Sequence, residues 1–292
     1  FFEGFGSLVK DTSNIKKIRI KTKDNNIEKT AKNVILATGA RSRNLPFVSS
    51  DGVNIWDYKT AMTPPKLPSS LIIVGSGAIG MEFASFYNDL GVDVTIVEAL
   101  PSILPNEDTD ISEIVKLNFE KRGIKIKTSS ALKSVTTKEN SVSAEIITNE
   151  KVETINSEKL ILAIGIIANT ENLGLEDFNV KIDKGHVVTN EFLETDEKGV
   201  YAIGDITEGP WLAHKASHEG ILCVEKIAGH KNLKPIDKTS IPGCTYSRPQ
   251  VASIGMTEEQ ARSSNLNLKI GKFPFIGNGK AIALGESEGL IK

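Results

Sequence analysis

Short apolar runs alternate with helical patterns through the first half of this chain. Residues 71–74 and 94–97 are continuous apolar runs typical of buried parallel strands, and residues 78–90, which hold no proline, predict a helix between them. Apolar side chains at helical spacing over 111–119 predict a second helix that ends near Gly123. The order strand, helix, strand, helix indicates a parallel sheet covered by helices.

Other segments carry strand and helix signals of the same kind. Further strands are predicted at 18–21, 33–37, 124–127, 142–147, 151–155, 160–163, 200–203 and 251–254. A helix is expected over roughly 210–229, and Thr257 with Gln260 fits a capping box at the start of another. The proline-rich stretch 64–68 predicts a stiff linker, because proline fixes φ and disfavours helix before it.

A glycine fingerprint joins the strand at 71–74 to the helix at 78–90. Gly75 permits the tight turn, Gly77 lets the backbone approach a pyrophosphate, and Gly80 allows close packing of helix and strand. The phosphates would lie on the free amides at the start of the helix, around Ala78 and Ile79. The motif predicts a dinucleotide site, where the alternative is a glycine-rich turn.

The second strand of this unit ends at Glu98, 18 residues after Gly80. A carboxylate there accepts hydrogen bonds from a ribose 2′-hydroxyl and repels a 2′-phosphate. No arginine occurs between Arg43 and Arg122, so the usual partner of the NADP phosphate is absent nearby. The sequence therefore favours NAD over NADP.

A second signature of nucleotide binding follows the apolar run at 200–203. Asp205 comes directly after the strand and next to Gly204. This position suits a carboxylate that accepts a hydrogen bond from a ribityl hydroxyl of FAD. An aspartate that caps a turn is the alternative.

Composition excludes several function classes. The 292 residues are 39% hydrophobic and 25% charged, with a formal net charge of −2, which gives no electrostatic case for nucleic acid or an anionic membrane. No apolar run is long enough to span a bilayer, and the start lacks the features of a signal peptide, so an intracellular protein is expected. Cys223 and Cys244 predict two reduced thiols, and His214 with His218 lack a third metal ligand, so no metal site is expected.

The residues quoted above, with 34–39 and 195–205, resemble the flavoprotein disulfide reductases with two dinucleotide-binding domains. Within that family the run 209–216 is most similar to the dihydrolipoamide dehydrogenases. The resemblance covers nearly the whole chain and implies an α/β fold with an NAD-binding domain inserted into part of an FAD-binding domain, followed by the start of an α+β dimerisation domain. The expected divisions are 1–67 and 190–236 for FAD, 68–189 for NAD and 237–292 for dimerisation.

The same resemblance implies the site residues. Gly165 would line the NAD site, and Glu82 would lie near the nicotinamide and flavin, paired with a lysine of the flavin domain. The residues expected at FAD are Ala37, Thr38, Gly39, Gly204, Asp205, Leu212, Ala213 and His214. In the implied mechanism dihydrolipoamide reduces a cysteine pair, from which electrons pass through FAD to NAD⁺.

Three features of the family are absent from the chain: the first FAD fingerprint, the redox Cys-x4-Cys and the C-terminal His-Glu base. The sequence is therefore interpreted as a fragment of a homodimeric enzyme that acts on lipoyl domains of 2-oxoacid dehydrogenase complexes, in a bacterial cytoplasm or, alternatively, the mitochondrial matrix. A mercuric or glutathione-type reductase and a non-catalytic dinucleotide-binding module stay open as rivals.

Overall fold

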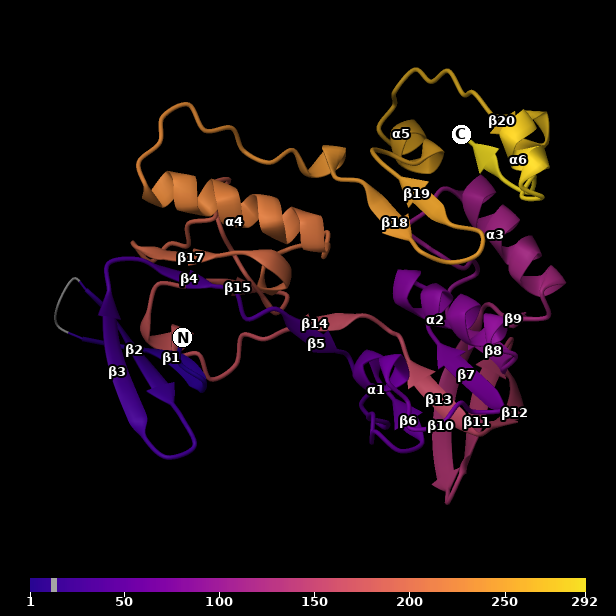
Figure 1. Cartoon of the computed structure of the whole chain (residues 1–292), viewed down its shortest axis with the longest axis horizontal. Coiled ribbons are helices and arrows are strands. Elements are labelled where there is room, and N and C mark those ends of the chain that lie inside the picture. Colours follow the sequence, from indigo (N-terminus) through magenta and orange to yellow (C-terminus); the bar gives the residue numbers. More distant parts are fainter. Residues whose placement is uncertain (12–14) are drawn as a thin grey trace. The chain divides into compact units, whose positions relative to one another are not determined.

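The computed structural model describes residues 1–11 and 15–292, which divide into two compact units. The first unit comprises residues 1–41 and 166–241, and the second comprises 42–165 and 242–292. Figure 1 colours both along the sequence. The α/β class and the nested order of segments expected from the sequence are confirmed.

The second unit is built on a five-stranded parallel sheet with the order β6-β13-β7-β8-β9. Its strands are β6 (Ile55–Trp56), β7 (Ser70–Val74), β8 (Asp93–Val97), β9 (Lys125–Lys127) and β13 (Lys159–Leu162). The helices of residues 42–165 are α1 (Tyr58–Met62), α2 (Ala78–Asp89) and α3 (Thr109–Lys121). The predicted strands and helices of this region are confirmed to within a few residues.

The two faces of this sheet are covered differently because alternate side chains of a strand point to opposite faces. Ile73 packs against α2 and α3, in one core with Met81 and Phe119. Its neighbour Ile72 packs in a second core with Val142, on an antiparallel meander. The meander strands are β10 (Ser130–Lys138), β11 (Ser141–Thr148) and β12 (Lys151–Ser157).

The first unit contains a two-stranded parallel pair, β4 (Val34–Leu36) with β17 (Val200–Ala202). Helix α4 (Ala213–Ile227) lies along this pair in Figure 1, and Leu222 and Cys223 of α4 share a core with Tyr201. The strands on the rest of this unit are β1 (Phe5–Val9), β2 (Lys16–Lys21), β3 (Asn26–Ala31), β14 (Ile166–Ala168), β15 (Ile182–Asp183) and β16 (His186–Val187), with β5 (Ala40–Ser42) paired to β14.

The observed division differs from the predicted one at residues 42–67. The prolines at 64–68 do not separate two units, because the segment before them joins the sheet of the second unit through β6. Trp56 is buried in that core, and Tyr87 Oη donates to the Ala61 carbonyl at 2.6 Å. These contacts place the segment with the second unit.

The observed division also differs at residues 166–189, which were expected with the NAD domain. Leu173, Leu175 and Val187 share a core with Leu8 and Leu36 of the first unit. Trp211 is 43% exposed, and its ring lies 5.0 Å from that of His186.

Residues 242–292 contribute a group of short elements to the second unit. These are β18 (Gly243–Thr245), β19 (Val251–Ser253), α5 (Glu258–Ser263), β20 (Phe273–Pro274), α6 (Gly279–Ala283) and β21 (Leu290–Ile291). The capping box of Thr257 and Gln260 at the start of α5 is present as predicted.

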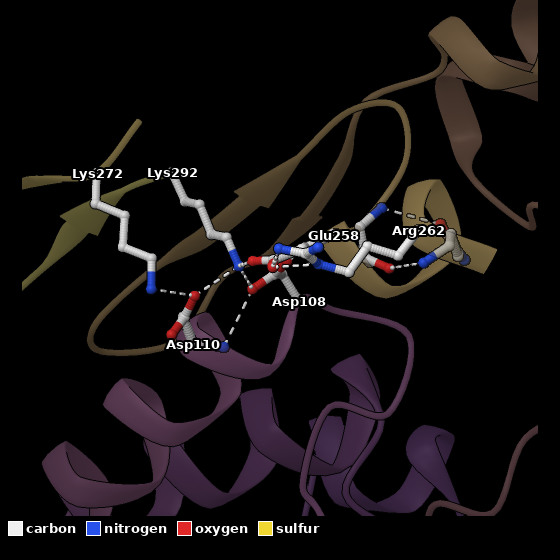
Figure 2. A network of polar contacts seen from close by, with 8 residues as sticks. Asp108, Asp110, Glu258, Arg262, Lys272 and Lys292 are labelled. Carbon is white, nitrogen blue, oxygen red and sulfur yellow. Dashed lines mark hydrogen bonds and ion pairs between the residues drawn. The ribbon is translucent and has the colours of Figure 1, made fainter. Parts of the chain in front are cut away.

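An ion-pair network links these elements to α3, as Figure 2 shows. Lys292 Nζ lies 2.8 Å from Asp108, 2.5 Å from Asp110 and 2.6 Å from Glu258. Lys272 pairs with Asp110 at 2.7 Å. Asp108 also caps α3 and accepts a hydrogen bond from the Glu258 amide at 3.0 Å, so one carboxylate serves the starts of two helices.

These contacts shift the titration of the carboxylates. Hydrogen bonds from Lys272 and Lys292 hold the pKa of Asp110 below its usual range, and those from Lys292 and Arg262 do the same for Glu258. Burial opposes the shift at Asp108, but hydrogen bonds from Lys292 and two backbone amides still lower the pKa of that carboxyl.

We expect Lys292→Met to lower the free energy of unfolding by about 2 kcal/mol at neutral pH, because it removes the shared cation from three carboxylates. Carboxylates with a lowered folded-state pKa stabilise the fold above the unfolded-state pKa of about 4 and lose that contribution as pH falls through the folded-state value. The difference between variant and wild type should therefore shrink as the solution is acidified, which urea titrations at several pH values measure.

Lys125→Met is the matched control, because Lys125 pairs with Asp93 at 2.7 Å but both side chains are more than half exposed. Its effect should stay below about 0.5 kcal/mol. A loss in Lys292→Met that is equal at neutral and acidic pH would contradict the assignment of the network as the cause.

Candidate functional site

The carboxyl ends of three neighbouring parallel strands bring the predicted NAD residues to one edge of the second unit. Gly75 follows β7, Glu98 follows β8, and Gly165 lies three residues after the end of β13. Because these strands are adjacent and parallel, the three positions come together although the chain separates them widely. This edge is where open α/β sheets bind ligands.

Two of the fingerprint glycines are required by the fold itself. Gly75 has φ of +99°, and a Cβ there would lie 2.4 Å from the Ala163 carbonyl oxygen. A Cβ on Gly80 would lie 2.0 Å from the Gly75 carbonyl oxygen. A side chain on Gly80 would push helix α2 away from the turn after β7, and one on Gly75 would push that turn away from the segment after β13.

Gly77 has no such structural role. Its φ of −68° and ψ of 179° are open to any residue, and no atom lies within 4 Å of a Cβ built there. As the N-cap of the 12-residue helix α2 it offers no side-chain hydrogen bond to the first amides. Space in front of uncapped amides at a helix N-terminus fits the pyrophosphate of a dinucleotide, with Ala78 and Ile79 exposed beside it.

Glu98 is 7% exposed and is held by three donors. Its Oε2 accepts hydrogen bonds from the Ser76 amide at 2.8 Å and from the Ser76 hydroxyl at 2.6 Å, while Oε1 accepts one from the Leu100 amide at 2.8 Å. In the part of the chain that the structure describes, no lysine or arginine pairs with this carboxylate. Three hydrogen bonds therefore fix this carboxylate, and its remaining acceptor position suits a hydroxyl donor and not a phosphate.

Glu82 lies on α2, two residues after Gly80. Its carboxylate is half-buried, and Oε1 accepts a hydrogen bond from the Tyr246 amide at 2.8 Å. The segment after β18 is anchored to α2 again where the Arg248 amide donates to the Ser85 hydroxyl at 2.9 Å. Glu82 is thus held in place by a backbone amide, and its expected role beside the nicotinamide and flavin stays a prediction.

The predicted flavin residues gather at one edge of the first unit. Because β4 and β17 are parallel partners, Ala37-Thr38-Gly39 and Gly204-Asp205 follow the same ends of adjacent strands. Asn169 fixes the first turn: its amide and side chain donate to the Gly39 and Thr38 carbonyls, both at 2.9 Å. Gly39 has φ of +66° and open space where a Cβ would lie.

Asp205 lies in a short 3₁₀ turn that follows β17. Its half-buried carboxylate has no hydrogen-bond partner among residues 1–11 and 15–292. Leu212 is the N-cap of α4, and Ala213 and His214 are exposed in its first turn. A free carboxylate opposite an open glycine turn fits a ligand that brings hydroxyl donors, as the ribityl chain of FAD does.

A buried ion pair behind this edge was missed from the sequence. Lys215 and Glu219 of α4 are 2% and 4% exposed and lie 2.8 Å apart. The Glu219 carboxylate accepts a hydrogen bond from the Gly204 amide at 2.7 Å. Lys215 Nζ donates a hydrogen bond to the Thr207 hydroxyl at 3.2 Å. The pair therefore fixes the turn that carries Asp205. The sequence signal for this pair was that Lys215, Glu219 and Cys223 are spaced four residues apart, which places them on one face of the helix.

The histidine and cysteine candidates form no cluster among the residues that the structure describes. Within the described residues no group of three or more histidine, cysteine or carboxylate side chains could hold a metal ion. Cys223 is buried, and burial together with Glu194 raises the pKa of its thiol to about 11; Cys244 is half-buried, and both thiols are free. Among the residues described, no helix has the length and apolar character needed to cross a bilayer.

Both units thus carry the features of a chain that binds two dinucleotides. A family model described as pyridine nucleotide-disulphide oxidoreductase matches residues 7–220, and the dimerisation domain of the same family matches residues 241–292. The chain belongs to the pyridine nucleotide-disulphide oxidoreductase family, which confirms the resemblance found in the sequence and the expected cofactors, FAD and NAD.

Individual relatives agree with this assignment. The chain is 52% identical over 264 residues to a dihydrolipoyl dehydrogenase of Rhizobium etli, covering 90% of this chain and 55% of the relative. The crystal structure of LpdA from Mycobacterium tuberculosis matches 98% of this chain and 62% of its own, with a TM-score of 0.90 and 28% identity. The flavoprotein disulfide reductase RclA of Escherichia coli shares the fold, with a TM-score of 0.85 at 24% identity. The chain spans about half the length of the curated relatives it matches.

We expect Gly77→Val to abolish NADH binding and to leave the fold intact, because the side chain would extend in front of the α2 amides and no atom lies within 4 Å of its Cβ. Titration calorimetry with NADH and a circular dichroism spectrum measure the two effects. Gly271→Val is the matched control, since Gly271 also has open space and an ordinary φ but lies outside the NAD edge. Retained NADH affinity in Gly77→Val would disprove the placement of the pyrophosphate.

We expect Glu98→Ala to weaken NADH binding by about 1–3 kcal/mol, because the ribose hydroxyl loses its charged acceptor. The loss is measured by calorimetry with NADH. NADPH should not suffer this loss, because its 2′-phosphate has no proton to donate to Glu98. Equal losses for both nucleotides would indicate a general disturbance of the edge.

Proposed function

We propose that this chain is part of an NAD-dependent dihydrolipoyl dehydrogenase, which oxidises dihydrolipoamide to lipoamide. The observation that carries the proposal is 52% identity over 264 residues to a protein of that name, together with the acidic, phosphate-excluding acceptor at Glu98. Relatives of the same name occur in Zymomonas mobilis and Bacillus subtilis at 51% and 42% identity.

Residues of this chain would contribute to two nucleotide sites, one for NAD and one for FAD. Gly77 and the first amides of α2 would hold the NAD pyrophosphate, Glu98 would bind the adenosine ribose, and Gly165 would line the same edge. In the other unit Asp205 would accept a ribityl hydroxyl, while the turns at Thr38-Gly39 and Leu212-Ala213 would contact the flavin. When bound, FAD supplies the two-electron chemistry between dithiol and nicotinamide.

The dithiol step needs cysteines other than the two in this chain. Cys223 is buried in α4 with its thiol pKa raised, which disfavours the reactive thiolate. Cys244 stands alone on β18. The redox pair would therefore come from residues beyond this sequence, in agreement with the half-length match to the relatives.

The proposal extends to assembly and location. The match of residues 241–292 to a dimerisation domain supports a homodimer. A lipoyl domain of a 2-oxoacid dehydrogenase complex would deliver the substrate, and the bacterial relatives favour the cytoplasm over the mitochondrial matrix.

The test is NADH formation by the full-length gene product, followed by absorbance. Rapid turnover is expected with dihydrolipoamide and NAD⁺, and not when NADP⁺ replaces NAD⁺ or reduced glutathione replaces dihydrolipoamide. Turnover with glutathione and NADP⁺ alone would show a glutathione-type reductase, and bound nucleotide without turnover of any dithiol would favour the binding module.

A further inference from the structure

Ser76, between the first two fingerprint glycines, is fully buried beside the NAD edge. In a turn a serine hydroxyl commonly hydrogen-bonds the backbone a residue or two away. Here both its amide and its hydroxyl point at one atom, Oε2 of Glu98, at 2.8 and 2.6 Å. No other acceptor for the hydroxyl occurs among the residues described.

The donor set leaves one position open on the carboxylate. A carboxylate offers about four lone-pair positions, two on each oxygen. Ser76 fills both positions of Oε2, and the Leu100 amide fills one of Oε1. One acceptor position remains, on Oε1. One hydroxyl group of a ligand would fill it.

We propose that Ser76 is a specificity-determining positioning residue: its hydroxyl locks Oε2 of Glu98, so that Oε1 is presented to the adenosine ribose 2′-hydroxyl of NAD. This inference rests on the proposed NAD site and names the residue that sets its selectivity. The amide of residue 76 holds Oε2 whatever its side chain, so the hydroxyl is the one donor to Oε2 that depends on a serine at this position.

Selectivity follows from the same geometry. A 2′-hydroxyl can donate a hydrogen bond to the open position on Oε1. A 2′-phosphate has no donor for this position and would lie against the fixed carboxylate of Glu98. Without the Ser76 hydroxyl only the two backbone amides hold the carboxylate, and Oε2 regains an open acceptor position. The preference for a donor at the ribose 2′ position should weaken, while contacts with the pyrophosphate stay unchanged.

The experiment compares NADH with the analogue whose adenosine ribose lacks the 2′-hydroxyl, both titrated by calorimetry into the full-length protein. We expect wild type to bind NADH about tenfold more tightly than the analogue, the effect of one good hydrogen bond to a charged acceptor. Ser76→Ala should reduce this ratio to about threefold or less and leave the affinity for the analogue unchanged. Ser76→Thr, which keeps a hydroxyl, should retain the ratio.

Ser85→Ala is the matched control, because Ser85 is a buried serine on α2 that accepts the Arg248 amide and does not touch Glu98. It should keep the wild-type ratio. If Ser76→Ala does not fold, Ser76→Cys, whose thiol is a weak donor, replaces it and should lower the ratio in the same way.

The outcomes separate this inference from the proposed site. An unchanged ratio in Ser76→Ala, with the ratio lost in Glu98→Ala, overturns the role of Ser76 and keeps Glu98 as the ribose ligand. Equal weakening of NADH and the analogue by Ser76→Ala shows a merely structural role and also overturns it. Equal binding of both nucleotides by wild type overturns the assignment of Glu98 and, with it, that of Ser76.

Discussion

The close approach of helix α2 to two neighbouring strands is the constraint on which the second unit depends. It is possible only because residues 75 and 80 lack side chains, since a Cβ on either would fall inside a backbone carbonyl. The same approach aims the first amides of α2 at the sheet edge and places Ser76 against Glu98. Packing and the proposed dinucleotide edge therefore share one origin, while Gly77 is the fingerprint glycine that packing does not require.

The two units hold their proposed nucleotide edges in place by different contacts. In the second unit three adjacent strands end at the edge proposed for NAD, and the glycines allow the helix to pack on them. In the first unit the turn after β17 is fixed by the buried pair Lys215 and Glu219, which ties the Gly204 amide to α4. Burying the two charges costs desolvation free energy, so the pair adds little net stability. Removing one partner leaves an unpaired buried charge, so the pair keeps that turn in one geometry.

Much of this could be predicted because the signals are local. The fingerprint glycines, the strand that ends at Glu98 and the capping box of Thr257 each depend on a few consecutive residues. Strand β10 was missed because a register shift between Leu132 and Ser134 breaks the alternation that marks a strand. The contact of Ser76 with Glu98 was missed because the two residues lie 22 positions apart. The packing of residues 42–67 on the second unit was missed because the burial of Trp56 depends on tertiary contacts.

The nesting of the two units has a consequence for how the chain acquires its structure. Strands β4 and β17 pair directly although about 165 positions separate them, whereas the central strands of the second unit lie within one continuous stretch. A loop of that length is expensive to close as a flexible coil, but its cost falls when the intervening stretch is already compact. The inserted unit thus acts as a folded spacer, and during synthesis the flavin-side pair can form only after that spacer and β17 have both been made.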